Sequence, residues 1–206
     1  SAKAEYIFNE KIEYHPVDEP DPKKLLFTTS KNLKKTCKLH GRLLACATGS
    51  TNIKSEYIDI GKGKCGISGL KFTTSAIYHI PEWKQKDKAS PEIQKKWNIM
   101  IEDAILHEKH HGEIQDRHMR KAYDKILKLE ARCKKMRKSV SKILKRFSDD
   151  EARENRRFDA RDSGKPTSFP NYPPLHSTAS SRRPQTFEFE YTYPPMPWPL
   201  PFKYST

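Results

Sequence analysis

The sequence lacks several features that would place it in common protein classes. No stretch approaches the run of about 20 apolar residues that a membrane span requires. No glycine-rich phosphate loop or RNA-binding signature is present, and no CxxC pair supports a four-cysteine zinc site. Only 34% of the 206 residues are hydrophobic and 32% are charged, too few apolar residues for a large core along the whole chain. We therefore expect one domain with an appendage and no membrane span.

Basic residues are present in excess, and they are concentrated in one segment. The net charge is +14, and the segment 119–146 holds twelve Lys and Arg residues against two acidic ones. Such a segment could attract nucleic acid, anionic lipid or an acidic partner. A solvated helix face explains it more simply. Because no nucleic-acid-binding motif accompanies the charge, nucleic acid is not an expected partner.

Short runs of β-favouring residues dominate the first ninety positions. The clearest strand region is 65–80, where Cys65, Ile67, Phe72 and Ile77 supply such residues. Four further runs have strand character: 6–14, 25–29, 43–48 and 57–60. Together these runs predict a small, mainly antiparallel sheet.

A helical pattern begins at Ser90. Ser90, Pro91 and Glu92 offer an N-cap residue, a proline at the first helical position and an acidic residue in the first turn. Apolar residues then recur every three or four positions as far as Phe147. The pattern predicts either one long helix or two helices joined near Gly112. The expected fold class is therefore α+β, with the sheet packed on this helix or helix pair.

The composition changes again after Phe147. Ten of the fifteen prolines lie in 166–201, among polar and aromatic residues. We expect a domain at 1–147 and an extended or disordered, proline-rich tail at 148–206. Within the tail, 187–193 alternates aromatic and polar residues as an added strand would, and 194–199 favours polyproline II. The tail is expected to dock as an extended segment, on this chain or on a protein partner.

The sequence His107-Glu108-Lys109-His110-His111 carries the main chemical signal. On a helix, His107 and His111 lie one turn apart and can offer imidazole nitrogens to one metal ion. Zinc suits two neutral imidazoles and a third ligand, with a position left open for water. Glu108 could then act as general base and proton donor, which implies hydrolysis of a peptide bond.

A histidine-rich polar patch at a helix kink is the alternative interpretation of this segment. Glu108 and His111 fall within the helical arc defined by Trp97, Ile101 and Ala104, and His107 lies at its margin. A solvated cluster should point the other way, whereas a metal site must face the body of the fold. The inward arc therefore favours a metal site.

The order of landmarks around this segment resembles a bacterial family of predicted secreted zinc-dependent proteases. The landmarks are a strand with Cys65, the run Ile80-Pro81-Glu82-Trp83, Trp97, the segment 107–114 and a later cysteine, Cys133. The resemblance covers about 6–146 and is tightest over 65–129. It implies that His107 and His111 bind zinc, that Glu108 is the catalytic carboxylate, and that the substrate is a protein or peptide.

The third ligand is not specified by the motif. Metzincin spacing would place a glycine and a third histidine at positions that hold Ile114 and Arg117, so the sequence departs from the metzincin pattern. His118 would lie about 16 Å along a straight helix from His107, and could join the site only if the helix broke near Gly112. Asp116, His79 and a more distant glutamate remain candidates.

Four cysteines fit two disulfides in an oxidising compartment, or free thiols in a reducing one. Cys37 and Cys46 could close a hairpin, and Cys65 could tie the sheet to Cys133 on the helix. The even count and the family resemblance together favour a secreted or periplasmic protein.

Two functions follow as hypotheses. The first is a zinc metallopeptidase, and the second is a metallopeptidase-like structural or adaptor subunit whose tail and basic helix bind partner proteins.

Overall fold

A computed structural model describes residues 3–37, 44–162 and 186–192. The expected strand at 43–48 is described only from residue 44, and the polyproline segment 194–199 lies outside these ranges. The elements follow in the order β1 (Lys3–Val17), α1 (Leu25–Cys37), β2 (Cys46–Gly61), β3 (Lys64–Trp83), η1 (Lys86–Lys88), α2 (Pro91–Leu127), β4 (Glu130–Arg132), η2 (Cys133–Lys135), α3 (Met136–Asp162) and β5 (Thr186–Thr192).

The fold is α+β, as expected, and its sheet is mixed. The strand order is β1-β3-β2-β5, with β4 pairing β3. β2 and β4 are antiparallel to β3, whereas β1 is parallel to β3 and β5 is parallel to β2. The expectation of a mainly antiparallel sheet is therefore wrong in direction for two pairings, β1 with β3 and β5 with β2. In each of these pairs the two strands are far apart in the sequence and are not joined by a hairpin.

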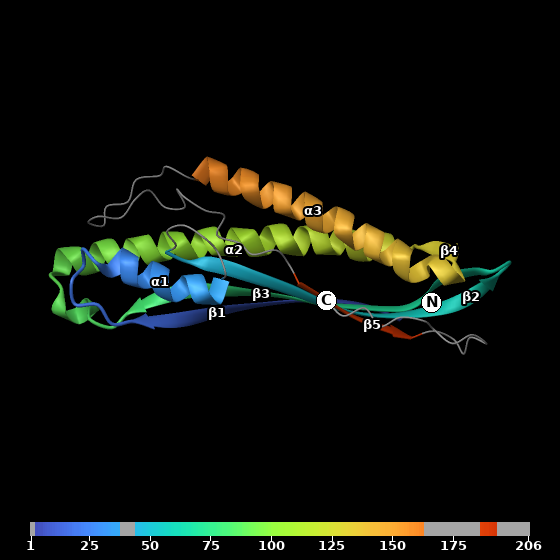
Figure 1. Ribbon diagram of the computed structural model, residues 1–206, viewed down its shortest axis with the longest axis horizontal. Coiled ribbons are helices and arrows are strands. Elements are labelled where there is room, and N and C mark those ends of the chain that lie inside the picture. Colours follow the sequence, from blue (N-terminus) through green and yellow to red (C-terminus); the bar gives the residue numbers. More distant parts are fainter. Residues whose placement is uncertain (1–2, 38–43, 163–185, 193–206) are drawn as a thin grey trace.

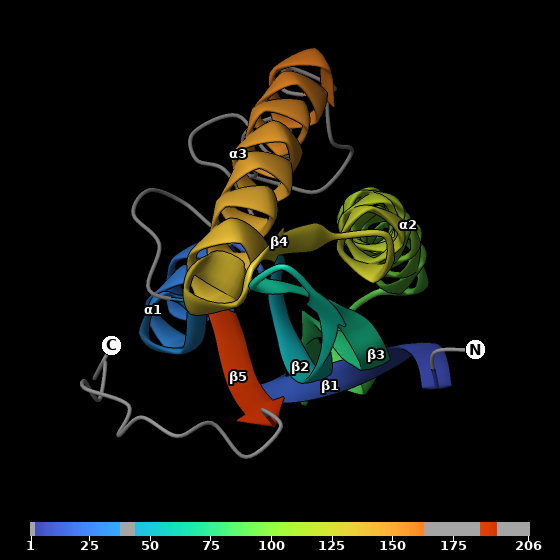
Figure 2. The same cartoon turned by 90° about the vertical axis from the view of Figure 1, so that its right-hand side faces the viewer.

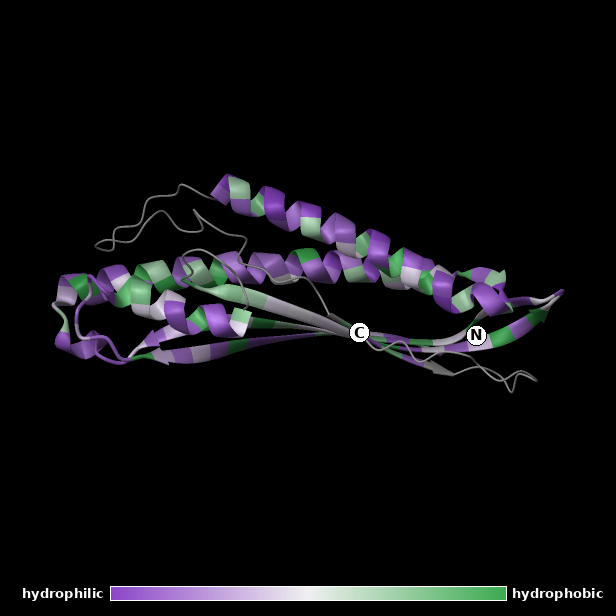
Figure 3. Ribbon diagram, in the orientation of Figure 1, coloured by the Kyte–Doolittle hydropathy of each residue, from purple (hydrophilic) through white to green (hydrophobic). Residues whose placement is uncertain are grey.

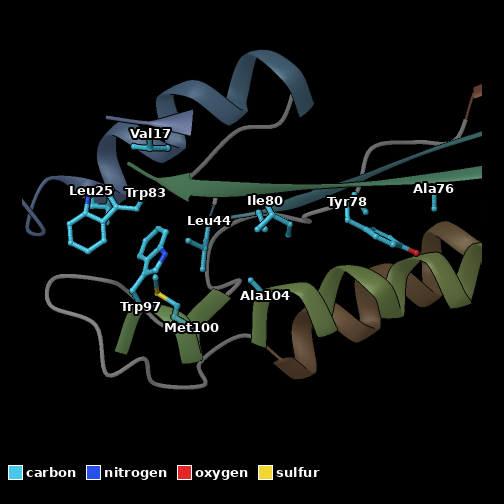
Figure 4. Close-up of a cluster of buried hydrophobic side chains, with 12 residues drawn as sticks. Val17, Leu25, Leu44, Ala76, Tyr78, Ile80, Trp83, Trp97, Met100 and Ala104 are labelled. Atoms are coloured by element: carbon cyan, nitrogen blue, oxygen red, sulfur yellow. The ribbon is translucent and has the colours of Figure 1, made fainter. Parts of the chain in front are cut away.

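The predicted strand at 25–29 is wrong, because this run begins helix α1. Its buried residues recur at helical spacing along α1 from Leu25 to Leu33 and Cys37. Figure 4 shows α1 and α2 on opposite sides of β3, so the sheet is covered on both faces at this end. A run as short as 25–29 is compatible with a strand or a helix, and the buried face of α1 against the sheet favours the helix.

α2 is one continuous helix that lies along the sheet (Figure 1). Ser90 caps its N-terminus by accepting a hydrogen bond from the Ile93 amide, and Pro91 occupies the first turn, as the sequence predicted. With 37 residues the helix is about 55 Å long. The helix ends at Leu127 and does not break near Gly112. Residues 130–132 then pair with the start of β3.

Gly112 is buried inside α2 for a packing reason. A Cβ built on Gly112 would lie 1.8 Å from the Tyr78 hydroxyl oxygen, so only glycine allows β3 and α2 this close. Tyr78 is fully buried and donates a hydrogen bond from its hydroxyl to Glu10 Oε1 at 2.6 Å. This contact fixes the height of α2 above the sheet next to His111.

Two apolar clusters hold α2 on the sheet. One surrounds Trp83, Trp97 and Ala104 near the start of the helix, and Figure 4 shows these side chains between β3 and α2. The other joins Phe72 and Ile126 with Leu144 of α3. Between the two clusters the buried residues of α2 are mostly polar. This polar stretch contains the predicted site.

α3 continues to Asp162, well beyond the predicted end of the domain at residue 147. Its first half packs beside α2 on the sheet, and its second half lies away from the sheet next to the middle of α2 (Figures 1 and 2). Figure 3 shows α3 as mostly hydrophilic, which is why the apolar pattern seemed to stop at Phe147. The part of the tail given to 148–162 is therefore helix.

The segment 187–193 of the tail was expected to dock as a strand, and 186–192 form β5 on the free edge of β2 in the same chain. Phe187 packs against the second apolar cluster, and Glu190 pairs with Lys54 at 3.0 Å. A paired edge is protected from pairing with other chains.

The disulfides join Cys37 to Cys46 and Cys65 to Cys133. The first links the end of α1 to the start of β2, which is a helix–strand connection and not a hairpin. The second links β3 to the turn before α3. Two disulfides are compatible with an exported protein. Among the residues described, no helix is long and apolar enough to cross a membrane.

We predict that Gly112→Ala destabilises the protein. Helix propensity alone would make alanine the better residue by about 1 kcal/mol, but the clash with Tyr78 should reverse the sign and cost about 2–3 kcal/mol. Gly66→Ala is the matched control, because its Cβ would meet Ile60 at an ordinary 3.5 Å. Thermal unfolding followed by circular dichroism measures both, and a stabilised Gly112→Ala protein would contradict the packing.

We predict that replacing Cys65 and Cys133 by alanine costs more than replacing the other pair. Their separation of 68 residues corresponds to about 4 kcal/mol of unfolded-chain restriction. Cys37 and Cys46 are 9 residues apart, which corresponds to about 2.5 kcal/mol. Urea unfolding of the two double variants should show this order, and the reverse order would refute it.

Candidate metal centre

The predicted ligands His107 and His111 lie together on the side of α2 that faces α3. His107 is 4% exposed and His111 is fully buried. Their Nε2 atoms are 3.1 Å apart, as the i, i+4 spacing on an unbroken helix allows. The structure thus brings both predicted histidines to one point.

Asp159 of α3 completes the group. Its Oδ1 atom lies 3.2 Å from His107 Nε2 and 3.0 Å from His111 Nε2. The three atoms form a nearly equilateral triangle, and the circle through them has a radius of about 1.8 Å. Such a spacing is compatible with zinc bonds of about 2.0–2.1 Å to all three atoms. His107, His111 and Asp159 could therefore hold a metal ion.

The outer nitrogens of both rings are held by α3. His107 Nδ1 lies 2.6 Å from Asp162 Oδ2, and His111 Nδ1 lies 2.7 Å from Asn155 Oδ1. Both oxygens are acceptors, so each Nδ1 carries the proton and donates it. With the proton on Nδ1, the Nε2 atoms remain available on the side of Asp159, as in metal-binding histidines.

The electrostatics of this cluster favour a bound cation. Two nitrogen lone pairs and a carboxylate oxygen converge in a buried space, and a shared proton or a metal ion relieves their repulsion. Burial lowers the pKa of His111, although the hydrogen bond and charge of Asp159 oppose that shift. The neutral imidazole is the form that coordinates a metal.

Glu108 is fully buried on α2 beside the two histidines. It is not one of the three residues whose ligand atoms converge. On the helix it lies about 60° around the axis from His111. Glu108 is therefore a buried carboxylate on the same turn of α2 as the two histidines.

The other candidate third ligands lie elsewhere. Asp116 accepts hydrogen bonds from Tyr6 and Arg120, and His118 pairs with Glu154 at 2.7 Å. His79 lies on β3 with its side chain on the other face of the sheet, as shown below. Because α2 does not break at Gly112, His118 remains about two helical turns beyond His111 and does not join the site.

An ion-pair cluster next to the centre fastens α3 to α2. Arg117 makes a bidentate pair with Glu154, with both nitrogen–oxygen distances 2.8 Å. The hydrogen bond from Arg117, helped by His118, lowers the pKa of Glu154 to about 2. The carboxylate therefore stays ionised at any ordinary pH, and the ion pair with Arg117 is kept over the same pH range.

The residues that sequence reasoning missed are Asn155, Asp159 and Asp162. They were assigned to the tail because no apolar residue marks their positions. A signal was present, since the buried stripe of α3 continues at spacings of three and four with polar members. The buried residues of this helix are Met136, Val140, Leu144, Glu151, Asn155, Asp159 and Asp162.

We predict that Asp159→Ala removes one bound divalent ion per chain, because two imidazoles alone hold a metal far more weakly. Asp162→Asn should keep the ion with affinity reduced about 10- to 100-fold, since it changes only the outer partner of His107. Asp149→Asn, on the exposed side of α3, is the control. Zinc titration calorimetry with metal analysis measures all three, and unchanged binding in Asp159→Ala would rule out this ligand.

A protein-family model matches most of this chain. No curated protein and no solved structure matches it. A model described as "Bacterial protein of unknown function (DUF922)" matches residues 12–165, which include β2, β3, α2 and the whole of α3. The match thus takes in Asp159 together with the two histidines, and it ends just after α3. Because it covers well over half of the sequence, the chain belongs to the bacterial DUF922 family.

Proposed function

We propose that this protein is a zinc-dependent peptide hydrolase, with zinc held by His107, His111 and Asp159. The observation that carries the proposal is the convergence of three ligand atoms, 3.0–3.2 Å apart, beside the buried glutamate of an HExxH segment. Two histidines and a carboxylate with an open fourth position form a donor set typical of catalytic zinc. The family resemblance stated above implies the same chemistry.

Each side chain has a separate task in this proposal. When bound, zinc lowers the pKa of a water molecule and polarises a peptide carbonyl. Glu108 accepts the proton of that water and passes it to the leaving amine. Asn155 and Asp162 hold the two rings in the tautomer that keeps their Nε2 atoms available.

Access to the centre requires movement of the side chains that cover it. Phe158 stacks on the His107 ring, with 4.5 Å between ring centroids, and meets His111 edge to face. Asp159 and Asp162 are also buried, so a peptide reaches Glu108 only if side chains that cover the centre, such as Phe158, move while Asp159 keeps its place.

The same burial favours a second candidate, a metal centre that only fastens α3 to α2. In that case the protein is a metallopeptidase-like structural or adaptor subunit. Structural zinc sites are closed to solvent, and His111 and Glu108 are fully buried. Hydrolysis by the zinc-loaded protein separates the two candidates.

We also propose that the protein works in an oxidising compartment, secreted or periplasmic. Two disulfides, one of them closing a separation of 68 residues, support this location.

We predict that Glu108→Gln keeps its zinc and loses at least about 100-fold in hydrolysis of casein and of a mixed peptide library, because the amide cannot take a proton. Glu113→Gln is the matched control, since Glu113 lies on the exposed side of the same helix. Metal analysis and mass-spectrometric detection of cleavage measure the two properties. A wild-type protein that holds zinc and cleaves neither substrate would favour the structural candidate.

A further inference from the structure

A second group of ligand side chains lies on the opposite face of the sheet. Tyr78 and Ile80 of β3 point toward α2, so His79 between them points away from it. Glu13 and His15 are two residues apart on β1 and share one face. The parallel register sets Glu13 beside His79, which brings the three side chains together.

The three ligand atoms fit one ion. His15 Nε2 lies 2.8 Å from His79 Nδ1, and Glu13 Oε1 lies 3.5 Å from the first atom and 3.9 Å from the second. The circle through these atoms has a radius of about 2.0 Å, which equals the zinc–nitrogen and zinc–oxygen bond lengths of about 2.0–2.2 Å. The three atoms are therefore spaced so that one ion could bind all of them.

The surroundings of His79 also suit a ligand. Its other nitrogen, Nε2, lies 3.0 Å from the Thr48 hydroxyl oxygen on β2. A ring proton donated there leaves the lone pair of Nδ1 directed at His15 and Glu13. His79 is 5% exposed, whereas the Glu13 side chain is 40% exposed, so solvent and ions reach the group from one side.

We propose that Glu13, His15 and His79 form a second metal site, which takes a late first-row divalent ion such as Zn²⁺ or Cu²⁺. The two imidazole nitrogens are borderline donors, which favour these ions over Mg²⁺ and Ca²⁺, and the carboxylate adds one oxygen ligand. The positions beyond the three protein ligands open toward solvent. The site is independent of the proposed hydrolysis, because the sheet separates it from His107.

Metal binding here would join β1 to β3 at the edge of the sheet. β1 is held by a parallel ladder to one neighbour, and an ion shared by the two strands adds a link that the unfolded chain lacks. The site would therefore raise the thermal stability of the protein in the presence of the ion.

The test is a zinc titration of the full chain with two single variants. We expect two ions per chain in the wild type and one in His15→Ala, with Glu13→Gln retaining the second ion at least 10-fold more weakly. His110→Ala is the control, since His110 is a partly exposed histidine of α2 that belongs to neither group. Circular dichroism checks that the variants are folded.

Copper provides the second readout. Electron paramagnetic resonance of the Asp159→Ala protein loaded with one equivalent of Cu²⁺ should show coupling to two imidazole nitrogens, and His15→Ala added to that variant should remove it. If His15→Ala and Glu13→Gln bind as many ions as the wild type with the same affinity, the three residues are a hydrogen-bonded histidine pair with a nearby carboxylate, and the proposal is wrong.

Discussion

The contact between Asp159 and the two histidines joins residues from separate helices, and the candidate centre depends on how α3 lies across α2. The turn at 128–135 sets this arrangement. Strand β4 pairs with the start of β3, and Cys133 is bonded to Cys65 in the same strand. α3 therefore runs back along α2, and the ion pair of Arg117 with Glu154 lies beside the centre.

The cost of burying polar groups explains the order of residues along α2. Apolar clusters at both ends of the helix provide the favourable free energy of packing. The polar middle is tolerated where each group finds a partner: Asp162 and Asn155 for the rings, and backbone carbonyls of Ser50 and Ser75 for the Gln115 amide. A bound cation would offset the negative charge and the lone pairs that Asp159 and the two histidines bring together.

Local patterns in the sequence were sufficient to predict the start of α2, the pairing of the two histidines and the added strand β5. The cap at Ser90 and the spacing of His107 and His111 are properties of one helix, so neighbouring residues determine them. The alternating aromatics after 186 likewise act within one strand. These features therefore follow from periodicity alone.

Features that depend on tertiary contacts were missed. Asp159 is 48 positions after His111 on a helix that lacks an apolar stripe at that point, so no local pattern connects them. The sequence left open whether the helix is continuous at Gly112, because the packing partner of Gly112, Tyr78, lies on β3. The parallel pairing of β1 was missed for the same reason, since strand direction is set by the connection and not by the residues of the strand.

We propose that α3 supplies the third ligand of the centre. Anomalous diffraction at the zinc edge, from crystals of the zinc-loaded protein, tests this ligand most directly. We expect an anomalous peak about 2.0–2.2 Å from His107 Nε2, His111 Nε2 and an Asp159 oxygen. A peak on the two histidines with any other third residue, or with the end of α3 away from α2, would contradict it.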